Sequence, residues 1–204
     1  MLANQRMIAD DGYEVALFPC EAMYLSTARD PAEHDIYALD FLPRNTEGEA
    51  ISPMNCYAPF SGTIVYTGSD HNCILQSDDK VHLPDGSISY ARILVAHSEV
   101  APILNYHYTQ GQLFYTTGDY GISGGEHLHI EGAKIDTPID QYWNTGGVGL
   151  YKGTHLWDIL YKNNTEILRD GSFDWIDYEG GTSTGVRHSK FPWVLYSRRL
   201  RERR

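Results

Sequence analysis

The most informative segment of the sequence reads Gly121-Ile122-Ser123-Gly124-Gly125-Glu126-His127-Leu128-His129-Ile130-Glu131, a glycine-rich turn that leads into a short predicted strand. Alternate residues of a strand share a face, so His127 and His129 point to one side, with backbones roughly 7 Å apart. Leu128 and Ile130 point to the other side, where we expect the core. We therefore expect one face of this strand to carry functional side chains and the other to pack against the core.

Two histidines on one face are a weak signal alone, because an exposed strand with two polar residues on its solvent side is the simpler explanation. Zinc sites that catalyse reactions use three protein ligands from His, Asp, Glu and Cys and leave one position for water. Asp40 lies near the end of the apolar residues 35–41, where a carboxylate is costly to bury without a partner or a metal. An aspartate bonded to loop amides is the alternative interpretation.

Short apolar stretches separated by Gly, Pro, Asn and Asp run through the chain and favour strands. The predicted strands are residues 13–18, part of 57–68, 74–76, 88–96 and 127–131. Residues 24–31 are predicted to be a polar connection, and residues 154–161 a short helix capped by Thr154. No alternation of strands and helices is visible. The pattern predicts a mainly β fold, an antiparallel β-sheet sandwich with few short helices.

His97 follows the strand predicted over residues 88–96, and its face is expected to be that of Ile93 and Val95. A lone histidine at the end of an apolar strand is usually a structural residue. It becomes a candidate functional residue only if the fold brings it near the two histidines described above.

The length and charge of the chain limit what it can be. A chain of 204 residues is near the upper end of what one core organises, so we expect a main domain over residues 1–170 and a C-terminal extension over residues 171–204. Lys and Arg number 16 against 27 Asp and Glu, and this net charge of -11 disfavours nucleic-acid binding. The basic residues 198–204 are interpreted as a solvated tail.

The cysteines and the apolar content argue against a disulfide-stabilised or thiolate-zinc protein and against a membrane-spanning protein. Cys20, Cys56 and Cys73 are odd in number and form no C-x-x-C pair, so we expect buried or free thiols rather than a disulfide framework or a thiolate zinc site. No stretch approaches the roughly 18 apolar residues of a membrane span. Residues 1–11 lack the basic and apolar regions of a signal peptide.

Several motifs occur in a characteristic order: His34 and Asp40, Ala58-Pro59-x-x-Gly62, His97, Gly111-Gln112, and the Gly-x-Ser-x-Gly-x-His-Leu-His-x-Glu segment. Over residues 13–135 this order resembles the lysostaphin-type zinc metallopeptidases, which cut peptide bonds in bacterial peptidoglycan. Residues 152–175 resemble the segment that follows this domain in tail-tip lysins of small tailed phages infecting Gram-positive bacteria. The resemblance implies a lysostaphin-like fold, a zinc (Zn2+) cofactor and a phage or prophage origin.

Carried over to this sequence, the resemblance implies that His34, Asp40 and His129 bind zinc, while His97 and His127 flank the attacking water. Two neutral imidazoles and one carboxylate leave the zinc positively charged, which acidifies its water ligand. One of the two flanking histidines then acts as general base, because histidine titrates near neutral pH. The sequence does not assign the individual steps to one or the other.

The first two ligands depart from the family pattern. The family usually places three residues, including a glycine, between its first His and Asp, whereas five residues without glycine separate His34 from Asp40. Asp35 is a candidate outer partner of the metal ligands. Three histidines in predicted loops are alternative ligands, each more simply interpreted as a surface residue: His71, His82 and His107.

Three hypotheses follow from the sequence. The leading one is a zinc endopeptidase that hydrolyses peptide cross-links of peptidoglycan, in the virion or outside the cell, with other phage tail proteins as candidate partners. The second is a non-catalytic phage tail or cell-wall-binding protein that keeps the peptidase fold, which the altered spacing motivates. The third is a zinc hydrolase that acts on a different amide.

Overall fold

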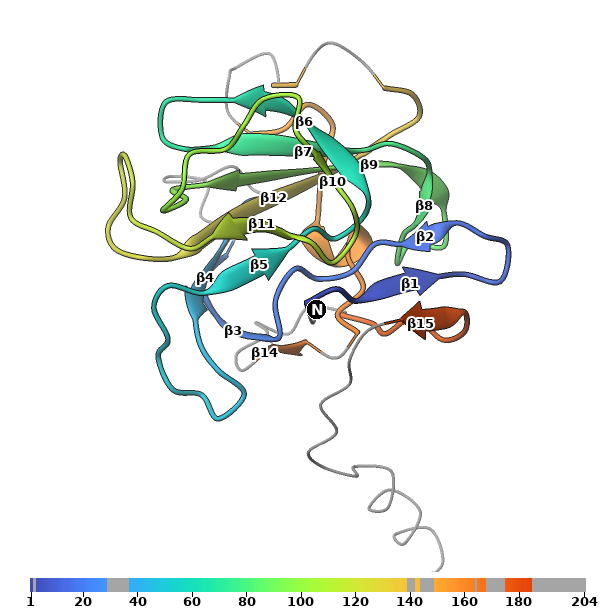
Figure 1. Cartoon of the computed structure of the whole chain (residues 1–204), viewed down its shortest axis with the longest axis horizontal. Helices are drawn as coiled ribbons and strands as arrows, with labels where there is room; N and C mark the ends of the chain where they lie inside the picture. The colour runs from blue at the N-terminus through green and yellow to red at the C-terminus, as the bar shows by residue number, and fades with distance from the viewer. Residues whose placement is uncertain are drawn as a thin grey trace, which may run out of the picture.

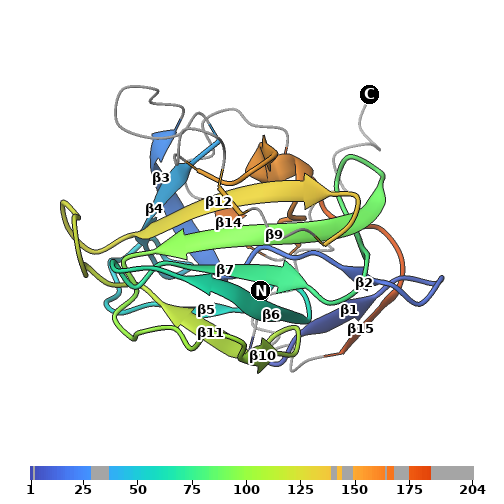
Figure 2. The same ribbon diagram turned by 90° about the horizontal axis from the view of Figure 1, so that it is seen from above.

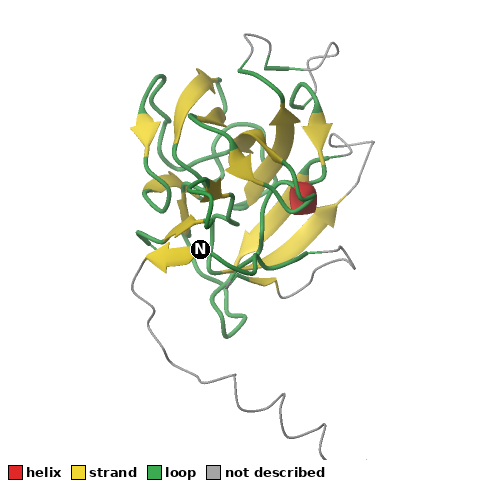
Figure 3. Cartoon of the chain, turned by 90° about the vertical axis from the view of Figure 1, so that its right-hand side faces the viewer, coloured by secondary structure: helices red, strands yellow, loops and turns green. Residues whose placement is uncertain are grey.

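The computed structural model describes residues 1, 3–28, 37–138, 142–143, 149–163, 165–167 and 175–184. In this part of the chain nearly all regular structure is β, as Figure 3 shows. The strands are β1 Arg6–Ile8, β2 Glu14–Val15, β3 Ala22–Ala28, β4 Leu39–Pro43, β5 Asn55–Tyr57, β6 Gly62–Thr67, β7 Cys73–Ser77, β8 Val81–His82, β9 Ile88–Ala96, β10 His107–Tyr108, β11 Leu113–Thr116, β12 Leu128–Ile135, β13 Gly153–Thr154, β14 Glu166–Ile167 and β15 Thr182–Thr184. A single helical turn, η1, covers Leu156–Asp158.

The strands form one large sheet and one small one (Figure 1). Thirteen strands make the large sheet, with the order β14-β3-β4-β12-β9-β8-β2-β1-β15. Strands β7, β6 and β10 continue it from β9, and β13 pairs with β12. Strands β12, β9, β7 and β6 lie side by side in Figure 2. The named pairs are antiparallel except β14 with β3 and β2 with β8. The mainly β, antiparallel fold class predicted from the sequence is confirmed.

The main core lies on one face of β12 and its neighbours. Leu128 and Ile130 of β12 have no exposed surface, and neither do Ile93 and Val95 of β9. Apolar side chains from β4, β5, β11 and η1 complete this cluster. Burial of such side chains stabilises the fold by about 1.5–3 kcal/mol each. The predicted alternation of the strand, with Leu128 and Ile130 turned into the core, is confirmed.

The opposite face of the same strands carries a second, smaller apolar cluster. The register places Glu131 of β12 beside Leu94 of β9, and Leu94 beside Ile74 of β7. Ile74 and Leu94 are buried there with Ala133 and Leu150. Glu131 therefore lies where this apolar cluster meets the polar part of the face, which carries His129 two residues earlier.

The polar connection predicted over residues 24–31 is wrong over residues 24–28, and residues 29–31 lie outside the described residues. Residues Ala22–Ala28 form β3, which pairs with β4 along most of its length. The segment is polar because only alternate positions face the core: Leu25 is buried, while Tyr24 and Ser26 are half-buried. A mixed sequence of this kind suits a strand with one covered face.

The helix predicted over residues 154–161 is also wrong in extent and in its cap. Thr154 belongs to β13 and pairs with Gly132 of β12, and η1 starts two residues later without a side-chain cap bond. The backbone N–H of Tyr161 donates to Ala16 at 2.9 Å instead of continuing a helix. Pairing with neighbouring segments thus competes with local helix formation and leaves one turn.

Three further expectations concern the cysteines, the domain boundary and membrane-spanning segments. All three cysteines are buried thiols, as expected. The boundary proposed at residue 170 falls outside the described residues, so the two-part division stays a prediction. Among the residues that the structure describes, no helix has the length and apolar character needed to cross a membrane.

Candidate metal centre

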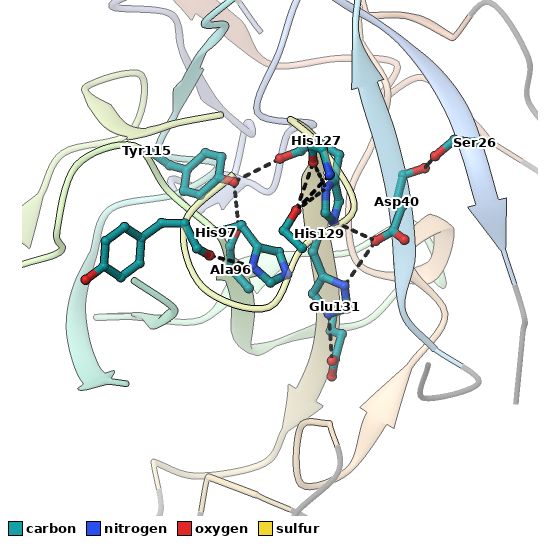
Figure 4. Close-up of polar contacts among 11 residues, drawn as sticks. Ser26, Asp40, Ala96, His97, Tyr115, His127, His129 and Glu131 are labelled. Carbon is teal, nitrogen blue, oxygen red and sulfur yellow. Dashed lines mark hydrogen bonds and ion pairs between the residues drawn. The ribbon is translucent and has the colours of Figure 1, made fainter. Parts of the chain in front are cut away.

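Asp40 and His129 face each other across neighbouring strands. The register of β4 and β12 pairs them directly, and the register of β12 and β9 places Ala96 on the other side of His129. Residues paired in this way project to the same face of a sheet. His127, two residues before His129, also projects to this face, and Figure 4 shows both imidazoles between Asp40 and His97.

Three ligand-type side chains converge at this point. Oδ1 of Asp40 lies 3.0 Å from Nδ1 of His129 and 3.7 Å from Nε2 of His127. All three candidate ligand atoms lie within 4.8 Å of one another. A tetrahedral zinc with bonds of about 2.0–2.1 Å separates its ligand atoms by roughly 3.3 Å. The donor types and their spacing therefore fit a zinc ion.

Glu131 completes the surroundings of His129 and was given no role by the sequence. Its Oε1 lies 3.2 Å from Nε2 of His129, and its Oε2 accepts a hydrogen bond from the backbone N–H of Leu150 at 2.8 Å. A carboxylate on Nε2 holds the proton there and leaves Nδ1 for a metal. The sequence feature that could have predicted this role is the position of Glu131 two residues after His129, on the same face of the strand.

The two carboxylates change the proton affinity of His129. Burial disfavours the charged imidazole, but the hydrogen bonds to Asp40 and Glu131 outweigh it and raise the pKa to about 9. Without a metal, both ring nitrogens of His129 face carboxylate oxygens, so the ring carries both protons. A metal cation on Nδ1 replaces one of these protons.

His97 reaches this face because the backbone leaves the strand conformation. Strand β9 ends at Ala96, and His97 has a φ of +66° in the left-handed region. The sequence expectation that His97 shares the face of Ile93 and Val95 is wrong, because those side chains fill the core. The ring of His97 instead lies 4.9 Å from that of His127 and 6.1 Å from that of His129, between centroids.

In their neutral form, the two flanking histidines leave Nε2 as the unprotonated ring nitrogen. Nδ1–H of His97 donates to the Tyr120 carbonyl at 2.9 Å, and Nδ1–H of His127 donates to the Gly125 carbonyl at 2.7 Å. A carbonyl only accepts, so the neutral rings carry their protons on Nδ1. Burial, joined by the nearby His127 and His129, lowers the pKa of His97 and keeps it neutral near pH 7.

Two polar groups hold the strand ends that carry these histidines. The hydroxyl of Tyr115 donates to the carbonyls of Ala96 at 2.6 Å and His127 at 3.3 Å. Next to His127, Glu126 accepts a hydrogen bond from Thr117 at 2.6 Å. The Tyr115 hydroxyl thus ties the end of β9 to the start of β12, so the two flanking histidines stay close together. Glu126 ties the start of β12 to Thr117, which follows β11.

The fold gathers four of the five site residues named from the sequence: Asp40, His97, His127 and His129. His34 lies outside the described residues, as does Asp35, so their predicted roles stay predictions. His82 pairs with Asp11 and His107 with Asp78, away from this cluster.

No known protein-family model matches the sequence. Similar solved structures include the catalytic domain of the antimicrobial peptidase lysostaphin from Staphylococcus simulans, with 20% identity over 55% of this chain and 79% of that chain and a TM-score of 0.37. A second lysostaphin structure has 21% identity over 58% and 45%, with a TM-score of 0.39. A zinc-containing peptidase from Vibrio cholerae has 12% identity over 66% and 44%, with a TM-score of 0.41.

The chain thus spans less than half the length of two of these three proteins. The similarities are remote in sequence and in fold.

Proposed function

We propose that this protein is a zinc-dependent endopeptidase that hydrolyses peptide cross-links of bacterial peptidoglycan. The observation that carries the proposal is the convergence of Asp40 and His129 from adjacent strands with two further histidines that present unprotonated Nε2 atoms. This set contains metal ligands and proton acceptors side by side. Those are the groups that metal-assisted amide hydrolysis requires.

In this proposal Asp40, His129 and His34 hold the zinc. A bound zinc would supply Lewis acidity, polarising the scissile carbonyl and acidifying water near neutral pH. The chain's own contribution is orientation. Glu131 fixes the ring of His129, and the backbone carbonyl of Tyr120 fixes that of His97.

His97 and His127 are the proposed acid–base residues. Each has its proton on Nδ1, so each Nε2 can accept a proton from the attacking water and later donate it to the leaving amine. The lowered pKa of His97 favours the neutral form that a base needs. His97 is therefore the preferred first acceptor, and His127 the preferred stabiliser of the charge that develops on the carbonyl oxygen.

The third metal ligand is the point to test first, because Nε2 of His127 also lies close to Asp40. If His34 is the third ligand, His127→Ala keeps one zinc per chain and loses activity. If His127 is the third ligand, the same variant loses zinc. Elemental analysis of His34→Ala and His127→Ala beside the wild type distinguishes the two arrangements.

Digestion of purified peptidoglycan tests the activity itself. An endopeptidase creates new amino termini within the cross-linking peptides, whereas an amidase separates whole peptides from the glycan. Wild-type protein should create such termini, and the metal-free protein and His129→Ala should not. Zinc binding without any cleavage would instead support the non-catalytic wall-binding alternative.

A phage origin belongs to the same proposal. Its support is the resemblance of residues 152–175 to the segment that follows the peptidase domain in phage tail-tip lysins. We propose that the protein acts on the cell wall from the virion or from outside the cell, where phage tail proteins would be its partners. Co-purification with assembled tails from phage-producing cells tests this placement.

A further inference from the structure

His97 is held in an unfavourable backbone conformation by two segments that are distant in sequence. Non-glycine residues with positive φ persist only where their surroundings hold them. The backbone N–H of His97 donates to the Asp70 carbonyl at 3.1 Å, and its carbonyl accepts from the N–H of Tyr120 at 3.4 Å. Tyr120 also accepts the Nδ1–H of the ring at 2.9 Å. The orientation of His97 thus depends on Tyr120 at two atoms.

The ring of Tyr120 lies flat against His71. The ring centroids are 3.5 Å apart and the ring planes differ by 1°. His71 donates from Nδ1 to the carbonyl of Ser98 at 2.9 Å, and Ser98 directly follows His97. These contacts therefore connect His97 to Tyr120, Tyr120 to His71, and His71 back to Ser98, the residue after His97.

The backbone on either side of Tyr120 is held at Gly118 and Gly121, whereas the side chain of Tyr120 is held by the ring stack. Tyr120 is 49% exposed, and it is followed by Gly121 with a φ of +85°. A Cβ atom at Gly121 would lie 2.6 Å from the carboxyl carbon of Asp70, so the two loops are in close contact there. Loss of the ring stack would free the Tyr120 peptide to rotate and withdraw its carbonyl from Nδ1 of His97.

We propose that His71 and Tyr120 are positioning residues that fix the Nδ1–H tautomer of His97 and direct its Nε2 toward the candidate metal centre. The kinetic consequence of this proposal rests on the hydrolase function proposed above, whereas the tautomer of His97 does not. An exposed stack that only stabilised the loop would leave the tautomer unchanged.

Imidazole nitrogen chemical shifts of the isotope-labelled full chain report the tautomer of each histidine directly. In the wild type, His97 should be a single Nδ1–H tautomer. In His71→Ala and in Tyr120→Ala, the Nε2–H tautomer should become populated. His71→Phe keeps a flat ring against Tyr120 and should restore much of the wild-type tautomer. His107→Ala, which removes a surface histidine paired with Asp78, is the matched control.

The kinetic arm measures peptidoglycan cleavage by the same variants. Misorientation of a base should lower kcat by about 10- to 100-fold with KM and zinc content unchanged. A single Nδ1–H tautomer of His97 in both alanine variants would overturn the proposal. Each variant removes one of the two stacked rings, so the test still stands if one variant fails to fold. If the tautomer changes in the variants but the wild-type protein does not cleave peptidoglycan, the positioning role of His71 and Tyr120 is supported and the proposed hydrolase function is contradicted.

Discussion

Asp40 and His129 are direct cross-strand neighbours on β4 and β12, with Oδ1 of the one 3.0 Å from Nδ1 of the other. The two side chains come from positions 89 residues apart in the sequence. This separation is that of a charge-assisted hydrogen bond in the metal-free chain and is also close to the spacing of two ligands of one zinc ion. His127 lies beside the same oxygen atom, so a third candidate ligand shares the position.

The first prediction concerns metal content. Wild-type protein should bind one zinc per chain, and Asp40→Ala and His129→Ala should each bind almost none, because each removes a donor atom from the cluster. Saturating zinc should also stabilise the wild type, by about 4 kcal/mol at a thousandfold excess over Kd. Elemental analysis and thermal unfolding measure both effects. Equal zinc content in the wild type and His129→Ala would contradict the site.

The second prediction concerns Glu131→Gln, which keeps the shape of the side chain and removes its charge. A neutral amide holds the ring of His129 less firmly and makes Nδ1 a weaker donor, so zinc affinity should fall by about 10- to 100-fold. Competition with a chromophoric chelator measures the affinity. Glu126→Gln, on the residue before His127, is the control and should change zinc affinity much less. Unchanged affinity in Glu131→Gln would exclude the orienting role.

The third prediction is a pH dependence of the metal-free protein. The pKa of His129 is about 9 in the folded chain and near 6.5 when unfolded. The folded state therefore binds the proton more tightly, and the resulting stabilisation is complete below pH 6.5 and is lost as the pH rises through about 9. Chemical unfolding from pH 6 to pH 10 in the presence of a chelator should show this decline. His129→Gln should show a flatter profile over the same range.

The fourth prediction compares two glycines near the site. A Cβ atom at Gly118 would lie 2.4 Å from the backbone nitrogen of Glu99 and 2.6 Å from the carbonyl oxygen of His97, whereas one at Gly124 would meet nothing within 4 Å. Gly118→Ala should therefore destabilise the protein by about 2–4 kcal/mol, and Gly124→Ala by less than about 1 kcal/mol. Urea unfolding of the two variants provides the comparison, and equal effects would refute it.

The fifth prediction concerns Cys20 and Cys56, whose sulfur atoms lie 3.0 Å apart in the core. Refolding with oxidised glutathione should join them, each thiol losing one hydrogen as glutathione is reduced, and leave Cys73 as the remaining thiol. Closing this loop should stabilise the chain by about 4 kcal/mol on the chain-entropy estimate. Thiol titration in denaturant counts the remaining thiols, and Cys56→Ser should refold without the cross-link. Three free thiols after oxidative refolding of the wild type would contradict the prediction.

The sequence by itself determined the strand-rich fold and the two-faced character of the His-x-His strand. Alternation is a local property with a period of two residues, so the burial of Leu128 and Ile130 opposite His127 and His129 could be predicted. The strand from Ile88 to Ala96 was predicted with its observed bounds, because a hairpin signal precedes it and an apolar run defines it.

The tertiary structure alone decided which residues meet at the site. The register that pairs Asp40 with His129 depends on strands far apart in the chain. The carboxylate partner of the His129 Nε2 atom, Glu131, is in turn held by the backbone N–H of Leu150. The turn of His97 out of the core face requires a positive φ that distant loops stabilise, and local sequence preferences do not encode such contacts. Long-range pairing, rather than local propensity, therefore assembled the candidate metal centre.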